Sequence, residues 1–261
     1  MPELPDVETV RRMLQRTIAG RRIGRVTVLG PSTVRSPAPR LFARRLRGRR
    51  VQGVGRRGKY LLIGLDGALT LAVHLRMTGD FVVAPRAATR DPHTRVVFFF
   101  DGTELRFVDQ RRFGHMDLLP TAGLQAWGLA RLGVEPLDRW FTLGEFRRIL
   151  AGRRGSLKAL LLRQDLIAGI GNIYADEILF QARLWPTRAL DSLSPAEMAR
   201  LHRAIRTVLR RATTSLSRYG KPVGELLRVR ESGGRCPRCG RPLTVMRAAG
   251  RTTYACRVCQ R

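Results

Sequence analysis

Long apolar runs are absent from this sequence. No run reaches the roughly 20 residues that a membrane-spanning helix requires, and the first residues lack the regions of a signal peptide. We therefore expect a soluble cytoplasmic protein that does not bind membranes. Internal repeats and low-complexity tracts are absent as well, and a hydrophobic content of 44% predicts packed cores rather than a disordered tail.

Acidic residues and lysine are scarce. The 261 residues, enough for two domains, include 20 Asp and Glu against 49 Lys and Arg, for a formal net charge of +29. This excess is larger than solubility requires, and it predicts a polyanionic partner. Only Lys59, Lys158 and Lys221 are lysines. Because lysine can give up its proton and arginine cannot, these three are candidates for chemistry.

Cysteine is confined to the end of the chain. The four cysteines form two Cys-x2-Cys pairs, Cys236 with Cys239 and Cys256 with Cys259. An intracellular chain rarely uses disulfides, whereas tetrahedral Zn²⁺ takes four thiolates at this spacing. We therefore expect one structural Zn²⁺, with residues 243–254 forming a β-hairpin between the pairs. A redox pair is the alternative, and the two matched units argue against it.

The pattern of apolar residues predicts an α+β fold. Apolar spacings of three and four from Val7 to Ile18 predict one amphipathic helix that ends at Gly20. Short β-type runs follow over residues 25–108, with Asp-Gly turn signals at 66–67 and 101–102. These runs predict an antiparallel β-sandwich or barrel-like core, in which the polar interval 85–92 is a mobile loop.

Past Gly114 the pattern is helical. Thr142 with Glu145 and Ser194 with Glu197 predict capping boxes, and the second opens a long helix with an apolar face from position 198 to 212. Between them, residues 165–172 form a glycine-punctuated turn that leads into a helix over 173–181. Its backbone N–H groups could hold a phosphate, although a tight structural turn explains the glycines equally well. A basic loop over 220–235 leads to the cysteines.

The first residues offer a candidate nucleophile. A proline at position 2 is small enough for the initiator methionine to be removed, which would leave the secondary amine of Pro2 as the terminus. An α-amino group loses its proton more readily than a lysine side chain, and Glu3 stands beside it to move protons. The alternative is a flexible terminus in which Pro5 opens a helix and Asp6 favours its positive end.

Three internal segments are candidates for contacts with the polyanion. Lys59 follows two arginines at the entrance to a strand, either as a reactive amine or as a phosphate contact. Met77 lies in a turn after a β run, as core filler or as an exposed apolar wedge. Arg111 and Phe113 follow another strand and suit a probe that fills the space of an extruded base, unless Phe113 packs inward.

Taken in order, these segments resemble the formamidopyrimidine-DNA glycosylase (Fpg) family. The match is colinear from residue 2 to residue 260, which makes the set far more specific than any one block. It comprises Pro2-Glu3-Leu4-Pro5, Gly58-Lys59-Tyr60-Leu61-Leu62, the block from His74 to Gly79, Arg111-Arg112-Phe113-Gly114, Ala168-Gly169-Ile170-Gly171-Asn172-Ile173-Tyr174, and the zinc hairpin from Gly250 to Gln260.

The resemblance implies a bifunctional DNA repair enzyme with three parts. These are a catalytic β-sandwich domain with an N-terminal helix over residues 2–115, a helix-two-turn-helix DNA-binding domain over 130–220, and a zinc finger over 227–261. Damaged double-stranded DNA would be the partner of a monomeric, nucleoid-associated enzyme. Zn²⁺ would be structural, and no redox cofactor or magnesium would be needed.

The resemblance also assigns roles to individual residues. Pro2 would attack C1′ of the damaged nucleotide, and Glu3 would be the acid that assists base loss and sugar opening. Lys59 would serve β-elimination and Arg251 δ-elimination. The space of the everted base would be filled by Met77, Arg111 and Phe113, and DNA would be contacted by His93, Arg111, Arg153, Lys158 and Asn172.

Departures from the family pattern bear on the substrate. Asp6, Arg76 and Gln110 stand where Glu, Gly and Pro are common, and the interval from Lys221 to Cys236 is shorter than in enzymes for oxidised purines. We expect excision of 8-oxoguanine and formamidopyrimidines by way of a Schiff base at Pro2 and β,δ-elimination. One alternative is an endonuclease VIII-like enzyme for oxidised pyrimidines. Another is a non-catalytic zinc-finger DNA binder on the same scaffold.

Overall fold

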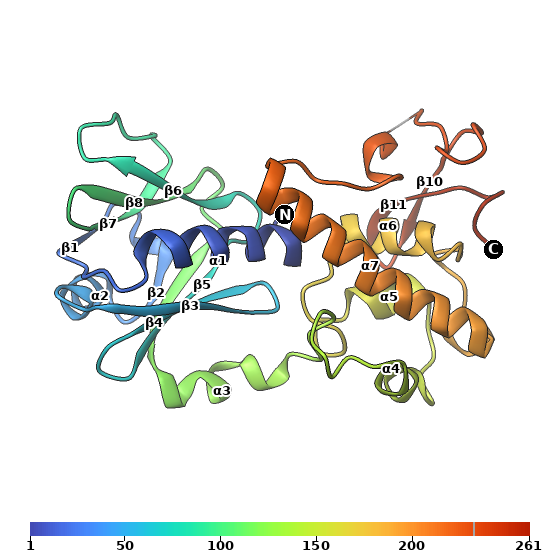
Figure 1. Ribbon diagram of the computed structural model, residues 1–261, viewed down its shortest axis with the longest axis horizontal. Helices are drawn as coiled ribbons and strands as arrows, with labels where there is room; N and C mark the ends of the chain where they lie inside the picture. The colour runs from blue at the N-terminus through green and yellow to red at the C-terminus, as the bar shows by residue number, and fades with distance from the viewer. Residues whose placement is uncertain (232) are drawn as a thin grey trace. The chain divides into compact units, whose positions relative to one another are not determined.

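The computed structural model describes residues 1–231 and 233–261 (Figure 1). The chain divides into two compact units. The first unit consists of residues 1–2 and 6–130, and the second of residues 3–5 and 131–261. Glu3 therefore belongs to the second unit, although Pro2 and most of the first helix belong to the first.

Two β-sheets form the first unit, as the sequence predicts. One sheet has the strand order β1 (Arg25–Val28), β7 (Thr94–Phe99), β8 (Thr103–Asp109) and β6 (Gly79–Pro85). The other has the order β2 (Val34–Ser36), β9 (His115–Pro120), β5 (Leu69–His74), β4 (Tyr60–Leu65) and β3 (Val51–Arg57). All strand pairs of these two sheets are antiparallel except β2 with β9, which is parallel. No hairpin turn joins β2 to β9, so no local signal sets their direction.

Both Asp-Gly turns are confirmed. The first joins β4 to β5 and the second joins β7 to β8, and Gly67 and Gly102 both have φ of 71°. A φ in this left-handed region is strained for residues with a Cβ and open to glycine. The turn residues therefore fix where each hairpin reverses.

One apolar core lies between the two sheets and two helices. The helix α1 (Leu4–Ile18) contributes Val7, Leu14 and Ile18, and α2 (Pro39–Leu46) contributes Phe42 and Leu46. The strands add the buried side chains Phe81, Phe98 and Phe107 from one sheet and Leu61, Ile63, Leu71 and Val73 from the other. Each such side chain contributes about 1.5–3 kcal/mol on burial, so the core holds both sheets and α1 together.

The first unit also has short helical segments, and the second unit is mainly helical. In the first unit η1 (Pro31–Thr33) joins β1 to β2, whereas η2 (Thr121–Gly123), α3 (Leu124–Trp127) and η3 (Leu129–Arg131) follow β9. The second unit contains α4 (Leu143–Leu150), α5 (Leu157–Leu162), α6 (Asn172–Gln181), η4 (Leu190–Ser192), α7 (Pro195–Tyr219), η5 (Leu227–Val229), β10 (Thr244–Ala248) and β11 (Arg251–Ala255). Across the described part of the chain, no helix combines the length and apolar character needed to cross a membrane.

The predicted capping boxes differ in outcome. At α7, Ser194 accepts a hydrogen bond from Glu197 N, and the Glu197 carboxylate accepts one from Ser194 N. At α4, Thr142 accepts from Glu145 N, but Thr142 N donates to a carbonyl and the Glu145 carboxylate pairs with Arg148. The box at Thr142 is therefore only half formed, because the guanidinium of Arg148 binds the carboxylate of Glu145.

Candidate active site and nucleic-acid interface

Glu3 is held at the N-terminal end of α6. Its side chain is 1% exposed, and its carboxylate accepts hydrogen bonds from the backbone N–H groups of Gly171 at 2.7 Å, Ile173 at 2.8 Å and Tyr174 at 3.1 Å. The turn that could hold a phosphate from sequence alone thus holds a carboxylate of the same chain. Three donors at the positive end of a helix stabilise negative charge on this side chain.

The glycines of this turn are required by the close approach of residues 3 and 4. A Cβ on Gly171 would lie 2.4 Å from Glu3 Cδ, and one on Gly169, whose φ is 92°, would lie 2.8 Å from Leu4 Cβ. Leu4 N also donates to Gly169 O at 2.9 Å. The two glycines therefore let the start of the chain lie against the turn, which fixes Glu3 and the peptide that joins it to Pro2.

Lys59 lies in the hairpin loop between β3 and β4. Arg57 pairs with Tyr60, so Gly58 and Lys59 form the whole loop, and Gly58 has φ of 55°. The Lys59 side chain is 7% exposed. Lysine is rarely buried unless its charge has a specific use, and a role of Lys59 in chemistry stays a prediction.

His74 lies beside this loop as a neutral ring. It pairs with Tyr60 across strands, and the two rings meet edge to face with centroids 4.7 Å apart. Burial lowers the pKa of His74 to about 3, and the positive charges of Arg76, His115 and Lys59 add to the effect. At neutral pH His74 therefore adds no positive charge near Lys59. His74 is in the sequence motif, but no role could be assigned to it from the sequence.

Met77, Arg111 and Phe113 are brought together on two neighbouring turns of the first unit. The β5–β6 turn carries Met77, which is 38% exposed, and the β8–β9 turn carries Phe113, which is 51% exposed. The guanidinium of Arg111 lies 4.7 Å from the centre of the Phe113 ring. Phe113 does not pack inward. The arrangement suits insertion into a duplex, and the roles of the three residues stay predictions.

His93 and Arg153 lie on the surface and remain candidates for DNA contacts. His93 is half-buried after the 85–92 loop, with Nδ1 at 3.3 Å from an Arg95 nitrogen. Arg153 donates from Nε to Ile149 O at 2.7 Å and lines a cavity of about 230 Å³ together with Arg154 and other residues. Both positions can present positive charge or a hydrogen-bond donor to a phosphate.

Lys158 has a different position from the one expected of a DNA contact. Its side chain is fully buried, and Nζ donates to Asp176 at 2.5 Å and to Thr253 at 2.6 Å. Asp176 also accepts from Arg230. Burial lowers the pKa of Lys158 and raises that of Asp176, against the attraction between them. Lys158 therefore joins α5 and α6 to the hairpin formed by β10 and β11. This contact links residues that are distant in the chain, and the sequence does not signal it.

Lys158→Met should lower the free energy of unfolding by about 3 kcal/mol, because breaking one side of a buried ion pair leaves a poorly compensated charge. Arg230 still pairs with Asp176, which keeps the loss at the lower end of the range for buried pairs. Thermal denaturation should show a Tm lower by about 6–12 °C. Lys221→Met changes an exposed lysine in the same way and should leave Tm nearly unchanged. Equal Tm values for the two variants would contradict the structural role.

Asn172 and Arg251 meet the same hairpin. Asn172 is the first residue of α6 and donates from Nδ2 to Thr252 O at 3.0 Å, so its amide nitrogen is engaged within the protein. Arg251 opens β11 after the turn at Ala249 and Gly250, and its side chain is exposed. Arg251 is therefore available to a DNA strand, on a hairpin fixed by contacts with α6.

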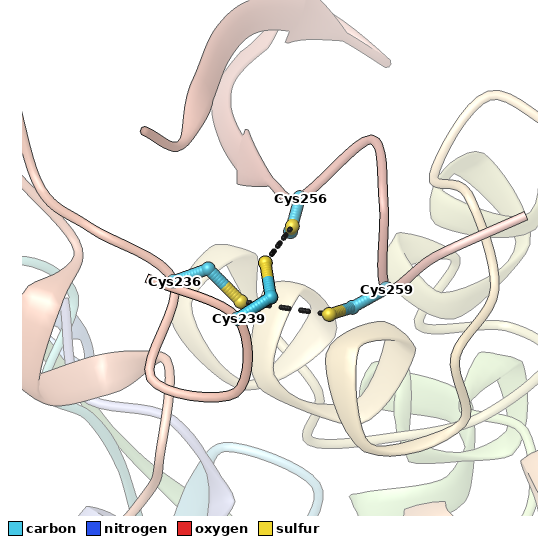
Figure 2. Close-up of side chains that lie close together, drawn as sticks. All are labelled: Cys236, Cys239, Cys256 and Cys259. Atoms are coloured by element: carbon cyan, nitrogen blue, oxygen red, sulfur yellow. Dashed lines mark hydrogen bonds between the residues drawn. The ribbon is translucent and has the colours of Figure 1, made fainter. Parts of the chain in front are cut away.

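The four cysteines lie together as the spacing predicts (Figure 2). Their sulfur atoms all lie within 4.8 Å of one another, with 3.8 Å between Cys236 and Cys259 and 3.5 Å between Cys239 and Cys256. A tetrahedron of thiolates around Zn²⁺ with bonds of about 2.3 Å has sulfur separations of about 3.8 Å. The donor set fits Zn²⁺, which would close the finger.

Glu177 fixes the segment that precedes the finger and was not predicted from sequence. Its buried carboxylate accepts hydrogen bonds from Glu225 N and Leu227 N, each at 3.0 Å. A Cβ on Gly224 would lie 2.7 Å from this carboxylate. The short interval before Cys236 is therefore anchored to α6, and no signal around Glu177 in the sequence distinguishes it from a surface acid.

Comparison with known proteins decides the family. The family model described as the formamidopyrimidine-DNA glycosylase N-terminal domain matches residues 1–116, and the one described as its H2TH domain matches residues 132–218. A formamidopyrimidine-DNA glycosylase of Symbiobacterium thermophilum is 47% identical over 273 residues, covering 100% of this chain and 89% of that protein. The chain belongs to the formamidopyrimidine-DNA glycosylase family. This confirms the resemblance expected from the ordered motifs.

Further members of the formamidopyrimidine-DNA glycosylase family agree in length and fold. The protein from Pelotomaculum thermopropionicum is 45% identical over 277 residues, covering 100% of this chain and 99% of that protein. Lactococcus lactis Fpg bound non-covalently to AP-site DNA is 33% identical with a TM-score of 0.89, and each chain is covered to 99%. The same enzyme with an oxidised-pyrimidine DNA gives a TM-score of 0.91 at 33% identity and the same coverage. The predicted α+β fold class is confirmed.

Proposed function

We propose that this chain is a bifunctional DNA glycosylase and AP lyase that excises oxidised bases, 8-oxoguanine and formamidopyrimidines among them, from double-stranded DNA inside the cell. The observation that carries the proposal is the fixation of Glu3 by three backbone N–H groups of the α6 turn. A residue next to the chain terminus is rarely buried and hydrogen-bonded in this way. Fixing Glu3 presets the peptide that joins it to Pro2.

The reaction begins at the Pro2 nitrogen after removal of Met1. This nitrogen forms a bond to C1′ of the damaged nucleotide as the bond from C1′ to the base breaks, and the base leaves with a proton. Opening of the sugar ring breaks C1′–O4′, protonates O4′ and leaves an iminium at C1′. Loss of a proton from C2′ then breaks the C3′–O bond, and a second elimination breaks the C5′–O bond.

The side chains near these steps have complementary roles. The Glu3 carboxylate stabilises the positive charge of the iminium and exchanges protons with the sugar. Lys59 serves β-elimination and Arg251 serves δ-elimination, as the family resemblance implies. Met77, Arg111 and Phe113 fill the space of the everted base. The four cysteines would hold a structural Zn²⁺, which would keep the hairpin of Arg251 closed.

Two further functions stay open to test. An enzyme for oxidised pyrimidines gains support from the L. lactis complex with an oxidised-pyrimidine DNA and from the short interval between Lys221 and Cys236. Side-by-side cutting of duplexes with 8-oxoguanine and with thymine glycol decides the preferred lesion. A non-catalytic DNA binder explains the charge and the cysteines, but it gives no reason for burying Glu3 and Lys59.

Borohydride reduction tests the catalytic proposal directly. We expect the full-length protein, incubated with an 8-oxoguanine duplex and sodium borohydride, to form a covalent protein–DNA complex visible on a denaturing gel. The reduced bond traps the iminium, which only an amine nucleophile can form. An undamaged duplex of the same sequence is the control and should give no complex. Tight binding to the lesion duplex without any trapping would show that the protein is a binder.

A further inference from the structure

One buried carboxylate joins the two turns that carry Met77, Arg111 and Phe113. Asp109 ends β8 and is fully buried. Its Oδ1 accepts a hydrogen bond from Thr78 Oγ1 at 2.5 Å, and its Oδ2 accepts from Gly114 N at 2.7 Å. Thr78 belongs to the turn of Met77, and Gly114 closes the turn of Phe113. Asp109 therefore bonds both turns with one side chain.

The hydroxyl group of Thr78 also links the two turns. Its Oγ1 donates to Asp109 and also accepts from Arg111 N at 3.1 Å. The hydroxyl thus donates to the last residue of β8 and accepts from a residue of the β8–β9 turn. Because these bonds cross between turns more than 30 residues apart in the chain, they do more than close either turn locally.

The backbone of both turns is held in a conformation that needs such support. Arg76 and Arg112 have φ of 57° and 58°, in the left-handed region that residues with a Cβ rarely adopt. Each immediately precedes an exposed apolar side chain, Met77 or Phe113. Both turns also pack against the ring of Phe107. A Cβ on Gly79 would lie 2.8 Å from Phe107 Cζ, and one on Gly114 would lie 2.6 Å from it. The hydrogen bonds and the packing on Phe107 together hold the two turns in one conformation.

We propose that Thr78 and Asp109 form a clamp that makes the two turns one rigid unit, so that Met77, Arg111 and Phe113 enter the duplex together during base eversion. Thr78 and Asp109 touch neither the sugar nor the base in this proposal and act as positioning residues. The inference rests on the proposed glycosylase function, because only a lesion that must be everted calls for insertion of all three side chains at once.

Thr78→Val tests the clamp, since valine keeps the shape of threonine and removes both hydrogen bonds. We expect single-turnover excision of 8-oxoguanine to fall on the order of 10-fold to 100-fold, the range that misplacement of about 1 Å produces. Strand cleavage at a preformed abasic site, which has no base to evert, should change less than about twofold. Thr78→Ser keeps the hydroxyl and should restore excision.

Thr103→Val is the matched control, because Thr103 lies on β8 in the same sheet and its hydroxyl makes no hydrogen bond within the described chain. It should behave as wild type on both substrates. The clamp is further tested by combining Thr78→Val with Met77→Ala. If the clamp acts through Met77, the loss caused by Thr78→Val shrinks in the Met77→Ala background.

The outcomes separate the clamp from the proposed function. Wild-type protein that cuts neither substrate would overturn the glycosylase assignment. Active wild type with a Thr78→Val variant that excises 8-oxoguanine normally would overturn the clamp. Equal losses on both substrates, with additivity in the double variant and a lower Tm, would also overturn it, because they indicate general damage to the first unit.

Discussion

Pro2→Gly is expected to reduce borohydride trapping on an 8-oxoguanine duplex on the order of 100-fold. Proline offers a secondary amine that forms an iminium without further protonation, and its ring restricts the direction of the nitrogen. Glycine offers a primary amine on a flexible backbone, so orientation toward C1′ is lost. The measurement is the rate of covalent complex formation under single-turnover conditions with saturating enzyme.

DNA binding should survive this change. Affinity for the duplex and its steep decrease with salt depend on contacts between arginine and phosphate rather than on Pro2. Pro92→Gly, at an exposed loop proline, is the control and should trap DNA as wild type does. Equal loss of binding and trapping in Pro2→Gly would mean damage to the fold. Mass spectrometry that finds Met1 on fully active protein would exclude Pro2 as the nucleophile, since its nitrogen would be an amide.

Removal of the Zn²⁺ that we propose for the four cysteines is expected to have the second of the two largest effects. Structural zinc contributes about 10–16 kcal/mol to the folding of isolated zinc-finger peptides, and here Cys236, Cys256 and Cys259 pack with Phe180, Leu226 and Leu243 in one small core. Without the metal, two of these sulfurs would remain as buried thiols with no fixed geometry. The hairpin that carries Arg251 would lose its support, and δ-elimination should fall more than β-elimination.

The metal prediction is checked with the whole protein. Metal analysis should give one zinc per chain, and dialysis against a chelator should lower DNA affinity on the order of 10-fold or more because the finger no longer presents its arginines. Addition of Zn²⁺ should restore both binding and the ratio of δ to β products. Cys239→Ser should behave like the chelated protein and should not recover with added metal. Undiminished binding and product ratio at zero zinc would contradict the structural role.

Local signals in the sequence predict much of the fold. The two Asp-Gly hairpins, the amphipathic α1 and the capping box at Ser194 all form where their residue patterns indicate, because each depends on neighbours within a few positions. The parallel pairing of β2 with β9 could not be predicted. It depends on the packing of strands that are distant in the chain, and nothing within β2 records its direction.

The candidate site also has features that the sequence predicts and features that only the structure reveals. The residue types at Pro2, Glu3, Lys59 and the four cysteines were selected from the sequence, because each type has a distinctive chemistry. The burial of Lys158 and the hydrogen bonds from the α6 turn to Glu3 could not be predicted from the sequence. Both depend on contacts between residues that are distant in the chain. A lysine in a basic chain looks like a phosphate contact until its partner Asp176 is known.

In the proposed reaction, the hydrogen bonds that hold Glu3 make the α6 turn part of the catalytic apparatus. Gly171 has no side chain to offer a substrate, yet its missing Cβ leaves the space that Glu3 occupies. Gly171 would not be recognised as a functional residue from its chemistry alone. A side chain at position 171 would displace the Glu3 carboxylate, so the proposed reaction depends on this glycine, which lies 168 residues from Glu3 in the chain.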